Sequence, residues 1–197
     1  MEPNGATREQ ILRAALKAFA DAGYAGTSVQ EIVDAARVTK PTMYYHFQNK
    51  AGLYQALLDQ AHDERYRLMQ QAAARADSLP EKLVEILAAL FGFLQNNREL
   101  MRLAFMTLFA SAGEIPSEIR YLDKCTRNYE FLHSLIKQGQ VEGVITRRYA
   151  SEELTMAIFG MLNIYVMGEV LRPNRKLNRR TAERIVALFL EGAGLRN

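Results

Sequence analysis

Residues 26–58 read GTSVQEIVDAARVTKPTMYYHFQNKAGLYQALL, and this stretch decides the fold because it holds two short helical patterns in close succession. Ser28 and Glu31 have the spacing of a capping box, which predicts the start of the first short helix. Thr39 can cap the second one, whose first turn accepts Pro41 because that position needs no N–H partner. The stretch therefore predicts two short helices joined by a tight turn, with a longer helix directly after them.

The rest of the chain also shows helical periodicity. Apolar residues recur at intervals of three and four rather than two, and Pro and Gly fall between the long periodic segments. Gly23 is the stop signal of the first helix. The fold class is therefore all-α, with about nine helices. We expect them over residues 7–22, 28–36, 39–47, 50–76, 78–94, 98–112, 117–138, 151–171 and 179–191.

Length and composition favour a folded chain. It has 197 residues, of which 49% are hydrophobic, so it can bury a substantial core in one or two domains. A boundary signal lies at DSLPE, residues 77–81, where a second capping-box spacing surrounds a proline. We expect an N-terminal domain over 1–66, with the two short helices at about 28–47, and a C-terminal helical domain over 67–197.

The cysteine content and the apolar windows indicate the compartment. The single cysteine, Cys125, cannot form an intramolecular disulfide, and no N-terminal stretch has the composition of a signal peptide. The most apolar window, Leu154–Gly168, is shorter than the roughly 20 residues that span a bilayer, and it contains Asn163. We interpret it as a buried helix and expect a cytoplasmic protein without a membrane anchor.

Charge gives a local rather than a global signal. The formal net charge is +3, and residues 1–66 contain 7 basic and 8 acidic residues, so no general basic patch predicts a nucleic-acid partner. Between Asp34 and Asp59, however, there is no acidic residue, whereas Lys40 and Lys50 lie within this interval. Lys50 stands at the start of the next helix, where its charge and the free N–H groups can hold a phosphate.

Two short helices joined by a tight turn, on the support of a first helix, form the arrangement that places a recognition helix in the DNA major groove. The second short helix would be the recognition helix, and its first turn faces the base edges. Lys40 can donate to guanine O6 and N7, while Pro41 and Thr42 can pack against a thymine methyl group. These three residues are therefore the base-contact candidates.

Four aromatic rings follow in consecutive positions. The polar tips of Tyr44, Tyr45 and His46 can contact phosphate oxygens, and a ring places its polar atom with little loss of rotamer entropy. Phe47 has no polar tip, so it should turn inward together with Met43. Tyr44 could instead belong to the core, although a ring can pack while its hydroxyl reaches outward.

The stretch 26–58 resembles the DNA-binding domain of the TetR family of transcriptional regulators. The resemblance covers about the first third of the chain. The residues that carry the resemblance are Gly26, Ser28, Ile32, Ala35, Val38, Thr39, Thr42, Tyr44, His46, Phe47, Lys50 and Leu53. The resemblance implies that Ser28 contacts a phosphate, that Gln30 contacts a base or a phosphate, and that Tyr45 lies beside the base-facing residues. The candidate DNA-binding residues are then Ser28, Gln30, Thr39, Lys40, Pro41, Thr42, Tyr44, Tyr45, His46 and Lys50.

The stretch departs from the family pattern at three positions. Val33 and Arg37 stand where small residues are common, so the first short helix and the turn can pack differently. Pro41 replaces a commoner glycine, which affects sequence preference more than the fold.

The resemblance also implies a homodimer that binds a palindromic operator, usually as a repressor, until a small molecule enters the C-terminal domain. The expected dimer residues lie in the two C-terminal helices and are Ile164, Met167, Ile185 and Phe189. The ligand-binding candidates are Phe91, Met101, Arg102, Phe105, Phe109, Tyr129, His133, Met156, Phe159 and Asn163. Among the polar residues of this region, Arg102, Asn128, His133 and Asn163 could orient a ligand. Flexible thioethers and aromatic rings suit an adaptable pocket, so we expect an apolar or aromatic effector.

The alternative is a helical dimeric ligand-binding or partner-binding protein with a vestigial DNA-binding domain, and a steep loss of DNA affinity with rising salt would distinguish the two. An enzyme is not expected. Cys125 and His133 can share a face of one helix, but the sequence shows neither a third partner nor an oxyanion site. His46, His62 and His133 are scattered and no Gly-rich phosphate loop occurs, so no metal or other cofactor is expected.

Overall fold

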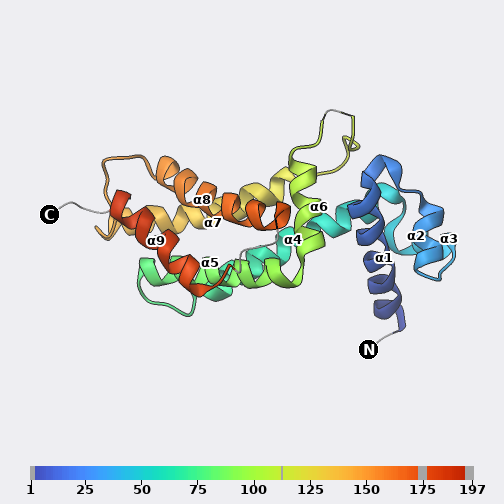
Figure 1. The fold of residues 1–197 in the computed structure, drawn as a ribbon, viewed down its shortest axis with the longest axis horizontal. Coiled ribbons are helices and arrows are strands. Elements are labelled where there is room, and N and C mark those ends of the chain that lie inside the picture. Colours follow the sequence, from blue (N-terminus) through green and yellow to red (C-terminus); the bar gives the residue numbers. More distant parts are fainter. Residues whose placement is uncertain (1–2, 112, 173–176, 194–197) are drawn as a thin grey trace. The chain divides into compact units, whose positions relative to one another are not determined.

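The computed structural model describes residues 3–111, 113–172 and 177–193 of the chain. In this part the chain forms nine α-helices and no strand, so the predicted all-α fold is confirmed (Figure 1). The helices are α1 (Pro3–Gly26), α2 (Val29–Ala35), α3 (Lys40–Phe47), α4 (Lys50–Ala73), α5 (Leu79–Asn96), α6 (Arg98–Leu108), α7 (Leu122–Val141), α8 (Ser151–Leu171) and α9 (Arg179–Ala193).

Most helices follow the prediction closely, but α6 and α7 are shorter than the predicted segments 98–112 and 117–138. Gly113 has a φ of +89°, a left-handed conformation that favours glycine, and Pro116 has no N–H group to donate. The residues between α6 and α7 therefore form a loop. Ile119 of this loop is buried, which ties the loop to the protein interior.

The chain forms two compact units, which we describe separately. The first unit comprises Met1–Ala61 and Arg98–Leu122, and the second comprises His62–Asn97 and Asp123–Asn197. The sequence predicts a single boundary after residue 66. In the structure, α6 comes from the middle of the chain and yet belongs to the first unit.

The first unit is built around the apolar face of α1. Ile11 and Phe19 are fully buried there, and the Phe19 ring packs edge-to-face on Tyr54 of α4, with 4.9 Å between centroids. The Tyr24 ring packs on Tyr54 in the same way at 5.2 Å. Gly23 lies between the two α1 rings with a φ of +71°, so it interrupts the helix, as predicted.

Polar contacts attach α6 to the end of α1. The Arg102 guanidinium donates a hydrogen bond to the Ala20 carbonyl oxygen and lies 3.8 Å from the Asp21 carboxylate. Carbonyl groups near a helix end lack intrahelical partners, so they are natural acceptors for such a donor. These contacts are the physical reason why the predicted boundary differs from the observed units.

The second unit contains the later half of α4 together with α5, α7, α8 and α9. Helix α9 packs on α5 and on α8. The Arg179 guanidinium of α9 lies 2.5 Å from the Glu85 carboxylate of α5, and the Gln95 side chain donates to the Leu177 carbonyl oxygen at 2.5 Å. The predicted apolar stripe of α5 is buried, namely Leu83, Ile86, Leu87, Leu90, Phe91 and Leu94.

Helix α8 is apolar on nearly all sides. Within the described residues it is the one helix that is long and apolar enough to cross a membrane, and 33% of its most apolar window is buried. Leu154, Ile158 and Leu162 are buried, whereas Met156 and Ile164 are 67% and 57% exposed. The prediction of a buried helix is therefore correct for only one side of α8.

We expect Tyr54→Phe to lower the free energy of unfolding by about 1 kcal/mol. The Tyr54 hydroxyl lies 2.8 Å from the Thr107 hydroxyl, which itself donates to the Leu103 carbonyl oxygen at 2.8 Å. Tyr54 is therefore the donor, and its loss leaves Thr107 without one bond in a buried site. Chemical denaturation measures the change, with Tyr45→Phe at an exposed position as a control that should match the wild type. Equal stability of both variants would contradict the role of this bond.

Candidate nucleic-acid interface

A capping box begins α2, as the sequence predicts. The Ser28 hydroxyl accepts the backbone N–H of Glu31 at 3.1 Å, and the Glu31 carboxylate accepts the backbone N–H of Ser28 at 2.8 Å. The hydrogen bond from the Ser28 backbone, and to a smaller extent one from its side chain, stabilises the Glu31 carboxylate and lowers the pKa of Glu31. These bonds fix the start of α2 and leave the Ser28 side chain exposed.

The turn after α2 contains a residue in an unusual conformation. Arg37 has a φ of +49°, in the left-handed region that costs roughly 1–2 kcal/mol for a residue other than glycine. The Val38 N–H donates to the Val33 carbonyl oxygen at 3.0 Å and closes the turn. Val33 is buried, so these two departures from the family pattern are accommodated within a closed turn.

The inner face of α3 is anchored in the first unit. The Thr39 hydroxyl accepts the backbone N–H of Thr42 at 3.3 Å, which caps the helix, and Thr42 is half-buried. Met43 is 0% and Phe47 is 5% exposed. The predicted inward orientation of both side chains is confirmed.

The outer face of α3 presents basic and aromatic residues. Lys40 and Pro41 are exposed in the first turn, and Tyr44 and Tyr45 are 44% and 77% exposed. The half-buried His46 ring lies 5.2 Å from the Tyr45 ring, edge to face. An exposed aromatic cluster of this kind is typical of a binding surface.

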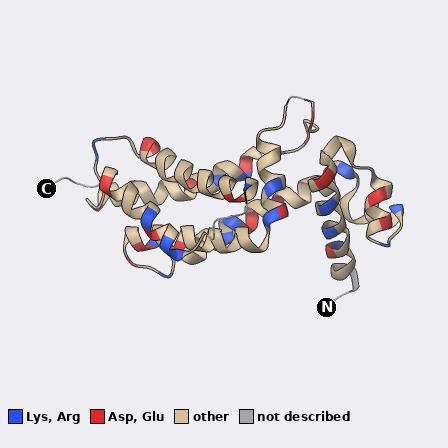
Figure 2. Ribbon diagram, viewed as in Figure 1, with Lys and Arg blue, Asp and Glu red and all other residues tan. Residues whose placement is uncertain are grey.

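Charge around this face is mixed. Figure 2 shows Lys and Arg interspersed with Asp and Glu along the N-terminal helices rather than collected in one patch. On α2, the exposed Gln30 side-chain amide donates a hydrogen bond to the Asp34 carboxylate at 2.7 Å. The amide nitrogen of Gln30 is therefore already bonded within the protein. Helix α3 itself carries no acidic residue, so its outer face has positive charge without an acidic residue of its own.

Lys50 has partners within the protein. Its ammonium group donates to the carbonyl oxygens of Tyr24 and Thr27, both at 2.9 Å, and lies 4.3 Å from the centroid of the Tyr24 ring. These contacts connect the start of α4 to the turn between α1 and α2. Sequence reasoning did not anticipate this structural role, because the partners are 26 and 23 positions away.

The predicted ligand-binding residues divide between the two units. The first unit holds Met101, Arg102, Phe105 and Phe109, and the second holds Phe91, Tyr129, His133, Met156, Phe159 and Asn163. The Tyr129 ring lies 5.7 Å from Phe159 and 6.2 Å from His133, so these three do meet. Phe109 and Met156 are 69% and 67% exposed. The ten residues therefore do not form one cluster within either unit.

Two predicted dimer residues lie inside the second unit. Ile185 and Phe189 are 1% and 5% exposed, because α9 turns them toward α5 and α8. Their placement in an interface was wrong, since they belong to the core of the unit. Ile164 is 57% exposed and Met167 is half-buried, so both remain accessible to a partner.

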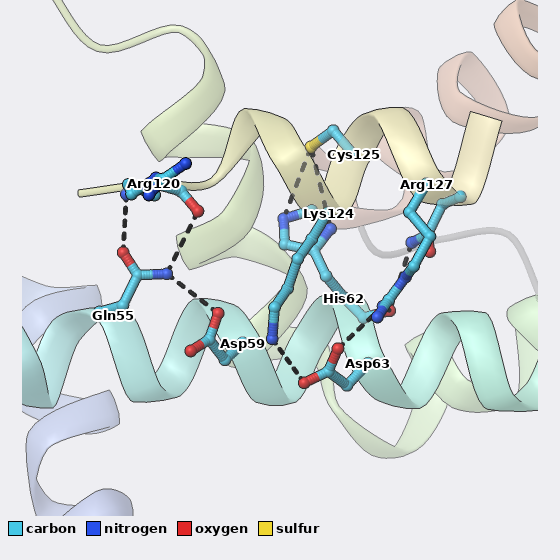
Figure 3. Close-up of polar contacts among 9 residues, drawn as sticks. Gln55, Asp59, His62, Asp63, Arg120, Lys124, Cys125 and Arg127 are labelled. Carbon is cyan, nitrogen blue, oxygen red and sulfur yellow. Dashed lines mark hydrogen bonds and ion pairs between the residues drawn. The ribbon is translucent and has the colours of Figure 1, made fainter. Parts of the chain in front are cut away.

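The polar contacts between α4 and α7 differ from those considered from the sequence. The Cys125 sulfur lies 3.6 Å from Nε2 of His62 (Figure 3). His133 Nε2 instead lies 2.9 Å from the hydroxyl of Ser151 in α8. Burial raises the pKa of the Cys125 thiol. No group of three or more His, Cys, Asp or Glu among the described residues could hold a metal ion.

Arg65 is a buried residue that sequence reasoning missed. It is 8% exposed, on the side of α4 that also buries Ala61 and Met69. A signal was available, because Arg65 stands four residues from each of these apolar residues and so interrupts a helical apolar stripe.

Together α2, the closed turn and the anchored α3 form a helix-turn-helix motif on the support of α1. The family model for bacterial regulatory proteins of the tetR family matches residues 11–57, which include this motif. Over these residues the chain is similar to this family.

The relatives of the chain are named as transcriptional regulators. It is 30% identical to the HTH-type transcriptional activator FasR of Mycolicibacterium smegmatis over 125 residues, which are 63% of this chain and 57% of FasR. It is 28% identical to the HTH-type transcriptional repressor BepR of Brucella suis over 171 residues, which are 83% of this chain and 82% of BepR. The chain thus spans little more than half the length of FasR.

Solved structures share the fold over the whole chain. The fatty acid degradation regulator FadR of Bacillus halodurans is similar with a TM-score of 0.84, 22% identity, and coverage of 100% of this chain and 99% of FadR. The transcriptional regulator FadR of Bacillus subtilis, solved in complex with stearoyl-CoA, has a TM-score of 0.81, 21% identity, and coverage of 93% and 98%. These likenesses concern the fold.

We predict that Lys50→Met lowers the free energy of unfolding by about 2 kcal/mol, because it removes two hydrogen bonds from a charged donor. Methionine keeps most of the length of the side chain, so the packing changes little. Urea denaturation followed by circular dichroism measures the effect. Lys40→Met is the matched control: Lys40 is exposed, and its loss should leave stability unchanged. A Lys50→Met protein as stable as this control would rule out the structural role.

Proposed function

We propose that the protein is a sequence-specific DNA-binding transcriptional regulator of the cytoplasm, without enzymatic activity. The observation that supports this most is the two-sided character of α3. Met43 and Phe47 anchor one side, while Lys40 and Tyr45 remain exposed on the other. The first turn of α3 then contacts base edges, and the polar tips of the aromatic residues contact the DNA backbone.

The proposed mode of action is repression of a palindromic operator, relieved by a small apolar or aromatic molecule in the second unit. BepR, which the chain matches over 82% of its length, is named a repressor. A ligand acts in such a system by binding the DNA-free conformation more tightly than the DNA-bound one. The contact of Tyr129 with Phe159 and His133 provides an aromatic surface suited to such a ligand.

The proposed assembly is a homodimer formed through the exposed apolar face of α8 and α9. Ile164 and Leu171 of α8 are 57% and 69% exposed, and Leu188 of α9 is 59% exposed. A groove of about 400 Å³ lies between these helices, and Ala157, Met161 and Leu188 are among its lining residues. A dimer would remove this apolar surface from water and give each operator half-site its own recognition helix.

For DNA binding, we expect Lys40→Met to weaken a selected operator roughly tenfold relative to scrambled DNA, because it removes a base contact. Tyr45→Phe should weaken both DNAs alike, because it removes a backbone contact. The operator is selected from a random library with the wild-type protein, and affinities are measured by fluorescence anisotropy over a range of salt concentrations. A protein that selects no sequence, or whose affinity does not fall with salt, would not be a regulator of this kind.

For assembly, we expect Ile164→Glu to convert the dimer to monomers at micromolar concentration, because it places a charge in an apolar interface. Sedimentation velocity measures the mass. Val141→Glu is the control: Val141 is 70% exposed on α7, outside the proposed face, and its replacement should leave the dimer intact. Ile185→Glu should unfold the second unit instead, since Ile185 is buried. A wild-type monomer would overturn the assembly.

A further inference from the structure

Three polar side chains of α4 and α7 are buried in the second unit. Arg65 and His62 of α4 are 8% and 5% exposed, and Asn128 of α7 is 2% exposed. The Asn128 amide donates to the His62 carbonyl oxygen at 3.3 Å. A cationic side chain is thus held inside a helical core, which is rare unless the charge is paired.

Arg65 has few partners for a guanidinium group with five N–H donors. Within the described residues its one hydrogen bond goes to the Asn163 amide oxygen of α8, at 3.5 Å, and no carboxylate pairs with it. Burial lowers the pKa of Arg65, and the nearby Cys125 acts in the opposite direction. A guanidinium group stays protonated in proteins, so a positive charge remains in the core.

The two carboxylates that stand next to Arg65 in the sequence of α4 form ion pairs with other cations. Asp63 lies 2.6 Å from the Lys124 ammonium and 2.8 Å from the Arg127 guanidinium of α7 (Figure 3). Glu64 pairs with Arg67 on the exposed side of α4. The acids beside Arg65 in the sequence therefore do not neutralise it.

Asn128 has a buried side-chain atom without a hydrogen-bond partner among the described residues. The Asn128 side-chain oxygen is buried and accepts no hydrogen bond from the described residues. A buried polar atom without a partner is rare in folded proteins. Asn128, with its free acceptor, and Arg65, with a single hydrogen bond among the described residues, both have hydrogen-bonding capacity left for a further polar molecule.

The surroundings of Asn163 indicate the rest of this molecule. The Asn163 amide donates to the Phe159 carbonyl oxygen at 2.8 Å, one turn earlier on α8, and the Phe159 ring packs on Tyr129. Asn163, which accepts the Arg65 hydrogen bond, thus stands one helical turn from an aromatic pair. A small molecule with an anionic group could pair with the Arg65 guanidinium group while its apolar part packs against the Phe159 and Tyr129 rings.

We propose that Arg65 binds the carboxylate of an apolar small molecule, so that the effector is an organic anion rather than a neutral compound. A carboxylate matches the fork of N–H donors on the guanidinium group, and exclusion of water strengthens the contact. This inference rests on the proposed function of the second unit as a ligand-responsive domain.

The test compares 4-phenylbutyrate with its uncharged amide, 4-phenylbutyramide, by isothermal titration calorimetry on the full-length protein. The wild type should bind the carboxylate at least about tenfold more tightly than the amide, as expected for a charge-assisted contact. Arg65→Met should abolish this preference, because the guanidinium group that binds the carboxylate is gone. The variant should stay folded, because the substitution removes a buried charge that no carboxylate pairs with among the described residues. Arg67→Met, on the exposed side of the same helix, should keep the preference.

Equal affinity for the two probes, no binding of the carboxylate, or an unchanged preference in Arg65→Met would each overturn the inference. DNA binding is measured on the same three proteins without any probe. If all three bind the selected operator while the carboxylate preference is absent, the proposed DNA-binding function stands and only the assignment of Arg65 fails. Loss of operator binding by the wild type would instead overturn the proposed function itself.

Discussion

The contact of the Lys50 ammonium group with the carbonyl oxygens of Tyr24 and Thr27 is the constraint on which the N-terminal unit depends. It joins the first turn of α4 to the turn between α1 and α2. A carbonyl near the end of a helix has no intrahelical donor, so a fixed cation satisfies it and also suits the negative end of the helix dipole. Since only two residues separate the end of α3 from Lys50, the first residue of α4, the same contact limits where α3 can lie.

Helix α3, the proposed recognition helix, depends on this support because it is short. Helix α3 has eight residues, and isolated helices of this length are unstable in water. Burial of Met43 and Phe47 supplies the tertiary stabilisation. This anchoring lets the outer face of α3 carry exposed lysine and tyrosine side chains, which stabilise the domain little and are the proposed DNA contacts.

Two features of the second unit suit function better than stability. An unpaired guanidinium group in the core is costly, and a well-packed apolar residue at position 65 would be at least as stable. The exposed apolar side of α8 is likewise unfavourable in water. Both features are explained by the proposed partners: a ligand that pairs with the Arg65 charge, and a second subunit that covers the apolar face at Ile164.

The helices and the helix-turn-helix motif could be predicted from the sequence because local interactions decide them. The capping box of Ser28, the cap of Thr39 and the stop at Gly23 each act within a few residues. The inward orientation of Met43 and Phe47 followed from their lack of polar tips and from helical spacing.

Only the tertiary structure decided which distant residues meet. The attachment of α6 to α1, the burial of Ile185 and Phe189, and the carbonyl partners of Lys50 could not be read from local patterns. The neighbours of Arg65 are a similar case, because Asn163, which accepts its hydrogen bond, is 98 positions away. Periodicity shows that a helix has a buried side, but which helix covers that side depends on the packing of the whole chain.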